Sequence, residues 1–168
     1  MTLQQSQALR SDTKGTSLYR DAMCCMFEDT QMFGDFLRHD LEILAHYANT
    51  REVENGELVF NEGDKGKQMY LVVRGSVKIL KDSGKETQSL TTVKKGHTMG
   101  EMSILDQLPY SASAVAEENT LLVAISQADF ELLAKEHPYL EFSILKRIAR
   151  LISLRLRQTT GSLVDHIA

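Results

Sequence analysis

Apolar residues recur with two different periods along this chain of 168 residues. Between residues 17 and 50 they are mostly three or four positions apart, as on one face of an amphipathic helix. Between residues 51 and 125, short β-rich runs alternate with glycine-containing turns, which is typical of a sandwich or barrel. Helical spacing returns at residue 126. The pattern therefore predicts an α+β fold with N-terminal helices, an antiparallel β domain and C-terminal helices.

Two helices are expected within residues 126–158. Ser126 has the side chain of an N-cap, and Asp129 follows three residues later. Pro138 should end the first helix, because the residue before a proline avoids the α region. A long helix should then run from residue 139 to about residue 157. Its apolar face is broader than one small neighbour would cover, so we expect a homodimer through residues 139–157. Residues 1–16 and 159–168 are expected to form polar tails.

Composition excludes several classes of protein. The net charge of −4 and the pI of about 5.7 do not favour nucleic acid as a partner. Apolar runs stay well below the ~20 residues that span a bilayer. The polar N-terminus lacks the apolar core of a signal peptide. The two cysteines, Cys24 and Cys25, are adjacent, and we expect them to stay reduced in a cytoplasmic protein.

Two stretches carry a resemblance to a known family. ENGELVFNEGDKGKQMYLVVRGSVKIL resembles the first half of a cyclic nucleotide-binding domain, and KKGHTMGEMSILDQLPYSASAV resembles the phosphate-binding cassette of that family, here residues 100–115. The family includes catabolite-activator-like regulators and regulatory subunits of cAMP-dependent kinase. The resemblance covers about residues 32–158. It implies a β-roll or jelly roll (a double-stranded β-helix), and a non-catalytic regulatory module for cAMP or a related cyclic nucleotide.

The resemblance also implies roles for individual residues. Gly100 matches the glycine that lets the backbone approach the sugar-phosphate, and Glu101 matches the carboxylate that accepts from the ribose 2′-hydroxyl. Met102 and Ser103 begin a short helix whose amides would face the phosphate, where a helix N-terminus favours an anion. Ser111 and Ala112 match small residues whose amides also reach the phosphate.

The sequence departs from the family at Tyr110. An arginine usually follows the cassette proline and pairs with the phosphate, but here the chain reads Pro109-Tyr110-Ser111. A charged hydrogen bond to phosphate contributes roughly 1.5–3 kcal/mol, so cAMP binding is expected to be weak. Tyr110 would offer one neutral donor or pack as an aromatic at the rim of the β domain. Arg155, near the turn of the last helix that closes over the base in this family, would restore part of the charge.

Alternatives to ligand binding stay open at this stage. A cassette without its arginine is also expected of a degenerate domain that serves only structure or protein interaction. A cupin-like metalloprotein would need more than the lone His97, so no metal and no cofactor are expected. We find no catalytic constellation. The short segment QTTGSLVDHIA after Arg157 leaves no room for a helix-turn-helix, so we expect no direct DNA binding and action through an unidentified partner.

Overall fold

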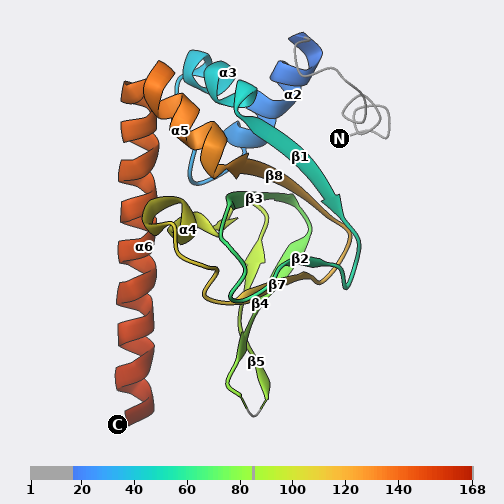
Figure 1. Ribbon diagram of the computed structural model, residues 1–168, viewed down its shortest axis with the longest axis vertical. Coiled ribbons are helices and arrows are strands. Elements are labelled where there is room, and N and C mark those ends of the chain that lie inside the picture. The colour runs from blue at the N-terminus through green and yellow to red at the C-terminus, as the bar shows by residue number, and fades with distance from the viewer. Residues whose placement is uncertain (1–16, 85, 168) are drawn as a thin grey trace. The chain divides into compact units, whose positions relative to one another are not determined.

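The computed structural model describes residues 17–84 and 86–167, so the expected tail at residues 1–16 lies outside the described residues. The chain divides into two compact units, Met1–Glu131 and Leu132–Ala168. The first unit contains the N-terminal helices and all the described strands, and the second contains most of the two C-terminal helices. The predicted order of helices, β domain and helices is therefore confirmed (Figure 1).

The N-terminal helices are α2 (Ser17–Glu28) and α3 (Arg38–His46). Arg38 joins them, because its guanidinium donates to Asp21 at 2.6 Å and to Glu28 at 3.0 Å. The hydroxyl of Tyr19 donates to the carbonyl of Ala48 at 3.2 Å and so fastens α2 to the first strand. That strand is β1 (Ala48–Val53), so the β domain starts slightly earlier than predicted. Helical spacing had placed Ala48 in a helix, but the strand pairs with β8 (Thr120–Ser126) instead.

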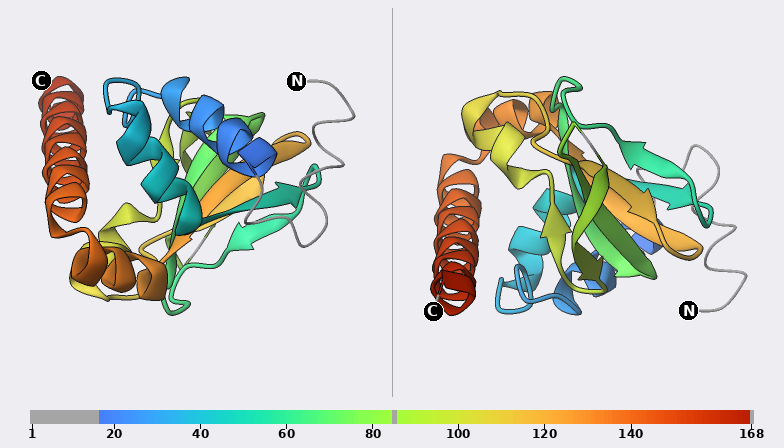
Figure 2. Two further views of the ribbon diagram at one scale, coloured as in Figure 1. Left: turned by 90° about the horizontal axis from the view of Figure 1, so that it is seen from above. Right: turned by 90° about the horizontal axis from the view of Figure 1, so that it is seen from below.

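The β domain is built from two four-stranded antiparallel sheets. One sheet has the order β1-β8-β3-β6 and the other β2-β7-β4-β5. This is the predicted β-roll (Figures 1 and 2). The strands are β1 (Ala48–Val53), β2 (Leu58–Phe60), β3 (Gln68–Arg74), β4 (Ser76–Asp82), β5 (Thr87–Lys94), β6 (Thr98–Met99), β7 (Ser113–Ala116) and β8 (Thr120–Ser126).

Both sheets contribute alternate residues to one core. Val72 of β3 and Leu122 of β8 meet Val77 of β4 and Ala114 of β7, and each of the four has no exposed area. Burial of these side chains is the main force that holds the sheets face to face. The β4–β5 hairpin, predicted from the KDSGKE turn, projects from the opposite end of the roll to α2 and α3 (Figure 1).

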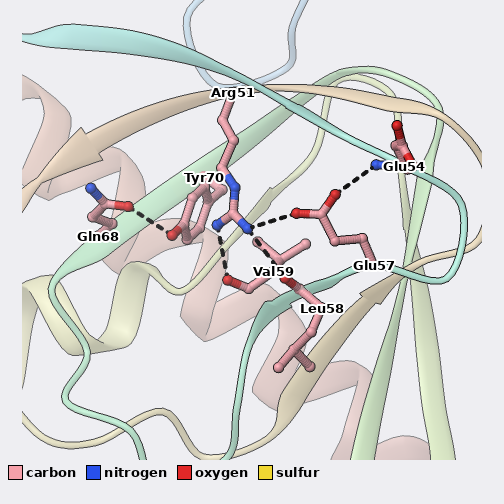
Figure 3. A network of polar contacts seen from close by, with 7 residues as sticks. All are labelled: Arg51, Glu54, Glu57, Leu58, Val59, Gln68 and Tyr70. Atoms are coloured by element: carbon pink, nitrogen blue, oxygen red, sulfur yellow. Dashed lines mark hydrogen bonds and ion pairs between the residues drawn. The ribbon is translucent and has the colours of Figure 1, made fainter.

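Arg51 joins the edge strands of the two sheets. It lies on β1, and its guanidinium donates to the carbonyls of Val59 and Leu58 on β2, at 3.0 and 3.2 Å (Figure 3). It also meets the Glu57 carboxylate at 3.4 Å. Edge carbonyls of β2 thus find a donor in the neighbouring sheet, which keeps them from pairing with another chain.

The C-terminal helices are α5 (Gln127–Glu136) and α6 (Pro138–Ile167). The predicted cap is confirmed, since the Asp129 amide donates to the Ser126 hydroxyl at 3.0 Å. The prediction of a tail from residue 159 is wrong for residues 159–167, which continue α6. The hydroxyls of Thr159 and Thr160 donate to carbonyls four residues earlier, so these polar side chains remain compatible with the helix. Across the described residues, no helix has the length and apolar character needed to cross a membrane.

Candidate functional site

The cassette begins at a glycine that the local geometry requires. Gly100 has φ of +75° and precedes α4 (Glu101–Asp106) as its N-cap. A Cβ atom there would lie 2.9 Å from the Gln68 carbonyl oxygen and 3.2 Å from Cε1 of Tyr110. Both the left-handed backbone and the close approach therefore disfavour a larger residue. The predicted short helix after Gly100 is confirmed.

The first turn of α4 has a buried side and an exposed side. Glu101 is 2% exposed and Ser103 3%, whereas Met102 is half exposed. The Ser103 hydroxyl donates to the Gly100 carbonyl at 2.7 Å and so tightens the turn. Gly66 packs against this turn, because a Cβ on it would lie only 2.1 Å from Cβ of Ser103. The structure therefore holds Glu101 in the interior at the first residue of a helix.

Tyr110 is fixed at the other end of the cassette by three contacts. Its hydroxyl donates to the Gln68 carbonyl at 2.7 Å and accepts from the Gln68 amide at 3.1 Å. Its ring stacks on Phe60 with the centroids 4.0 Å apart, and Phe60 stacks in turn on Tyr70 at 5.8 Å. Burial raises the pKa of the Tyr110 phenol. This geometry is that of an aromatic packed into the roll, while its predicted contact with a phosphate stays a prediction.

Gln68 links Gly100 to Tyr110, although no sequence motif points to it. Its carbonyl oxygen is the atom that limits the space at Gly100 and accepts from Tyr110. Its side-chain Oε1 also accepts from the Tyr70 hydroxyl at 2.7 Å (Figure 3). A backbone carbonyl leaves no mark in a sequence motif, so only the fold reveals this role.

Residues after Tyr110 alternate between the two faces of the chain, as the sequence predicts. Ala112 and Ala114 are buried on the side of Tyr110, whereas Ser111 is exposed and Ser113 is half-buried. The Ser113 hydroxyl accepts from the Glu62 amide at 2.9 Å. The EGD turn after β2 is thereby attached to the end of the cassette, where the Gly63 amide also donates to the Tyr110 carbonyl at 2.9 Å.

The charges at the site differ from those expected of a phosphate site. Residues 100–115 include two carboxylates, Glu101 and Asp106, and no lysine, arginine or histidine. Arg155 belongs to α6 in the second unit, and its predicted contact with the ligand stays a prediction. Among the described residues, a cation that no sequence motif marks touches the cassette. Lys81 of β4 donates to the Ser111 carbonyl at 2.8 Å and is paired with Glu62.

The described part of the chain contains no group of three or more histidine, cysteine, aspartate or glutamate side chains arranged to hold a metal ion. His97, the residue considered for a cupin-like site, is exposed, and its Nδ1 lies 3.2 Å from the Lys95 carbonyl.

Comparison with known proteins agrees with this geometry. The sequence profile described as "Cyclic nucleotide-binding domain" matches residues 50–137, from β1 to the end of α5. The chain belongs to the cyclic nucleotide-binding domain family. The resemblance found from the cassette and the EGD turn is confirmed, and the fold is the β-roll of this family.

Three relatives illustrate the likeness. The cyclic AMP receptor protein of Thermus thermophilus is 31% identical over 128 residues, which are 76% of this chain and 57% of that protein. A cyclic nucleotide-binding domain from Methylobacillus flagellatus has a TM-score of 0.77 and 28% identity, and the match covers 87% of this chain and 83% of that one. A regulatory subunit of a cAMP-independent protein kinase A from Trypanosoma cruzi, bound to guanosine, shares the fold with a TM-score of 0.68 at 20% identity, over 88% of this chain and 53% of that one.

Proposed function

We propose that this protein is a regulatory, non-catalytic module that binds the ribose of a cyclic nucleotide or nucleoside through Glu101. One observation carries the proposal: the left-handed Gly100 is followed by a carboxylate that is 2% exposed at the first residue of α4. A carboxylate accepts hydrogen bonds, and a ribose 2′-hydroxyl is a donor from which Glu101 can accept. The N-terminus of α4, where Glu101 stands, favours the negative charge of a cyclic phosphate.

The proposed affinity for a cyclic phosphate is weak. The cassette itself contributes two carboxylates and no cation, and the Tyr110 hydroxyl is already engaged with the Gln68 backbone. A neutral nucleoside does not need a cation, and the Trypanosoma cruzi relative is described as bound to guanosine. We therefore expect cAMP and cGMP to gain less over adenosine and guanosine than they would with an arginine at position 110.

Calorimetric titration with these four ligands and with 2′-deoxyadenosine tests the proposal. The wild type should bind the ribosides and bind the deoxy analogue more weakly. Glu101→Ala should lose affinity for adenosine and leave the affinity for 2′-deoxyadenosine nearly unchanged. Equal losses for both ligands in a folded variant would show that Glu101 does not read the 2′-hydroxyl, and absence of all binding by the wild type would reject the proposed function.

A second candidate is a ligand-free domain for protein interaction. The stack of Tyr110, Phe60 and Tyr70 favours it, because three aromatic rings occupy the core at the end of the cassette. A domain of this kind would bind none of the five ligands, yet Gly100→Ala would still destabilise it. The same titration therefore separates the two candidates.

Signalling would run through α6 to a partner that the sequence does not name. We expect a cytoplasmic homodimer with its contact in residues 139–157, no resident cofactor, and no direct contact with DNA or membrane. The chain spans 57% of the length of the Thermus thermophilus relative.

A further inference from the structure

Lys81 is held against the main chain of the cassette. Its ammonium donates to the Ser111 carbonyl at 2.8 Å and to Oε1 of Glu62 at 2.5 Å. Ser111 directly follows Tyr110, the position at which the family usually has its arginine. A cation from β4 thus lies one residue from the position where the cassette lacks one.

The strand register directs Lys81 toward the core side of β4. Val77 belongs to the core and Ile79 packs against it, so alternation gives Lys81 the same face. The pairing of Ile79 with Ala114 and of Leu80 with Ser113 shows that β4 runs regularly beside β7. Continued by one residue, that register sets Lys81 opposite Ala112, inside the cassette.

Glu62 holds Lys81 in this place. Its second oxygen accepts from the Asp82 amide at 3.2 Å, and the Lys81 ammonium keeps the pKa of Glu62 below its usual range. The pair is partly open to solvent, with the lysine side chain 45% exposed and the glutamate 29%. Ion pairs of this exposure contribute little to stability, and a lysine stem is flexible. An incoming anion would therefore exchange with Glu62 at small cost.

We propose that Lys81 is the counter-charge of this cassette and exchanges its contact with Glu62 for the anionic group of the ligand. The inference rests on the proposed function and adds a residue that determines specificity for anionic over neutral ligands. Glu62 then has the opposite effect, because its carboxylate competes with the ligand for the same ammonium.

The chain offers a matched control on the same strand. Lys78 is paired with Glu117 at 2.7 Å, with 41% and 29% of the two side chains exposed, but it lies on the opposite face of β4. Lys81→Met and Lys78→Met remove the same charge from similar surroundings. Glu62→Gln and Glu117→Gln form the corresponding pair of carboxylate variants.

Calorimetric titration of these four variants and the wild type with cAMP and with adenosine tests the inference. Lys81→Met should weaken cAMP binding by about ten-fold, the loss of one charged hydrogen bond. Glu62→Gln should tighten cAMP binding several-fold, and that gain should shrink as salt is added. Adenosine binding should stay unchanged in all variants, and the Lys78 and Glu117 variants should match the wild type with both ligands.

Three results would overturn the inference. Lys81→Met could leave cAMP binding unchanged, or Lys78→Met could weaken it equally, which would show a general effect of net charge. Lys81→Met could also weaken adenosine and cAMP alike, which would show that Lys81 does not read the anion. If the wild type binds neither ligand, the proposed function fails and this inference fails with it, an outcome distinct from the other three.

Discussion

Tyr110 and Gln68 form a double hydrogen bond that joins the cassette to β3. The Tyr110 hydroxyl donates to the Gln68 carbonyl at 2.7 Å and accepts from its amide at 3.1 Å, across 42 positions of sequence. Gln68 is the first residue of β3, where the sheet ladder begins. The Tyr110 side chain therefore adds two hydrogen bonds to the backbone at the start of β3, next to the cassette. Position 110 thus has a structural role.

We predict that Tyr110→Phe lowers the free energy of unfolding by about 1–3 kcal/mol, because it leaves the partly buried amide and carbonyl of Gln68 without this partner. The ring keeps its stack on Phe60, so the loss reports the hydroxyl alone. Tyr70→Phe is the comparison, since its hydroxyl donates to the side chain of Gln68 instead of to the Gln68 backbone. Urea denaturation measures both. Equal stability of Tyr110→Phe and the wild type would show that the double hydrogen bond contributes nothing.

Stability should also fall in alkaline solution. Burial raises the pKa of Tyr19 and Tyr110 from an ordinary value of 10.0. Below pH 10 both phenols are neutral in the folded and unfolded chain, and their contribution is fully present. Above it the unfolded chain ionises first, so stability is lost as pH rises through the raised values. Tyr110→Phe should reduce the slope of unfolding free energy against pH in this window. An unchanged slope would contradict the raised pKa of Tyr110.

The sequence predicted much of the fold because its signals are local. The glycine turns, the alternation after Tyr110 and the Ser126 cap each involve neighbouring residues, and each is confirmed. The start of β1 and the end of α6 were misplaced, because the local pattern of apolar and polar residues does not decide them. Ala48 is compatible with a helix until its pairing with Ile125 is known, and the threonines after residue 158 bond within the helix.

The site was less predictable, because its main contacts join distant segments. Gly100 and Glu101 stand in a motif, so the sequence could identify them. Gln68 acts through its backbone, and Lys81 reaches the cassette only because β4 pairs with β7. A motif search therefore finds neither residue. The alternation of Val77, Ile79 and Lys81 does place Lys81 on the core face of β4, but its contact with the cassette follows only from the pairing of β4 with β7.

Gly100→Ala should destabilise the protein more than an ordinary replacement of glycine at positive φ. The left-handed conformation costs a residue with a side chain roughly 1–2 kcal/mol. At Gly100 a Cβ would also lie 2.9 Å from the Gln68 carbonyl oxygen, whereas at Gly56, with φ of +80°, it would meet nothing within 4 Å. Urea denaturation of Gly100→Ala against Gly56→Ala therefore isolates the close approach. Equal losses would show that backbone conformation alone accounts for the glycine.

The proposed dimer can be tested on exposed positions of α6. Ile148 has no exposed area, so a glutamate there would test folding instead of assembly. Phe142 and Leu156 are 62% and 66% exposed, and their separation of fourteen residues sets them on one stripe of the helix. Phe142→Glu should give a monomer by light scattering, while Leu37→Glu, at a 73% exposed position outside α6, should not. A dimer that survives both Phe142→Glu and Leu156→Glu would contradict this contact.

Tyr110→Arg should tighten cAMP binding by about ten- to a hundred-fold, because a guanidinium offers a fork of donors that matches phosphate oxygens. The substitution also removes the stack on Phe60 and the bonds to Gln68, so the free energy of unfolding should fall at least as far as in Tyr110→Phe. Adenosine is the control ligand, since its affinity should not rise.

Adding Lys81→Met to Tyr110→Arg separates the contributions of the two cations. If Lys81 already binds the anion, the double variant keeps only part of the gain in cAMP affinity. A folded Tyr110→Arg protein that still shows no cAMP binding would show that the missing arginine is not the only defect, and the ligand-free interaction domain would then explain the cassette better.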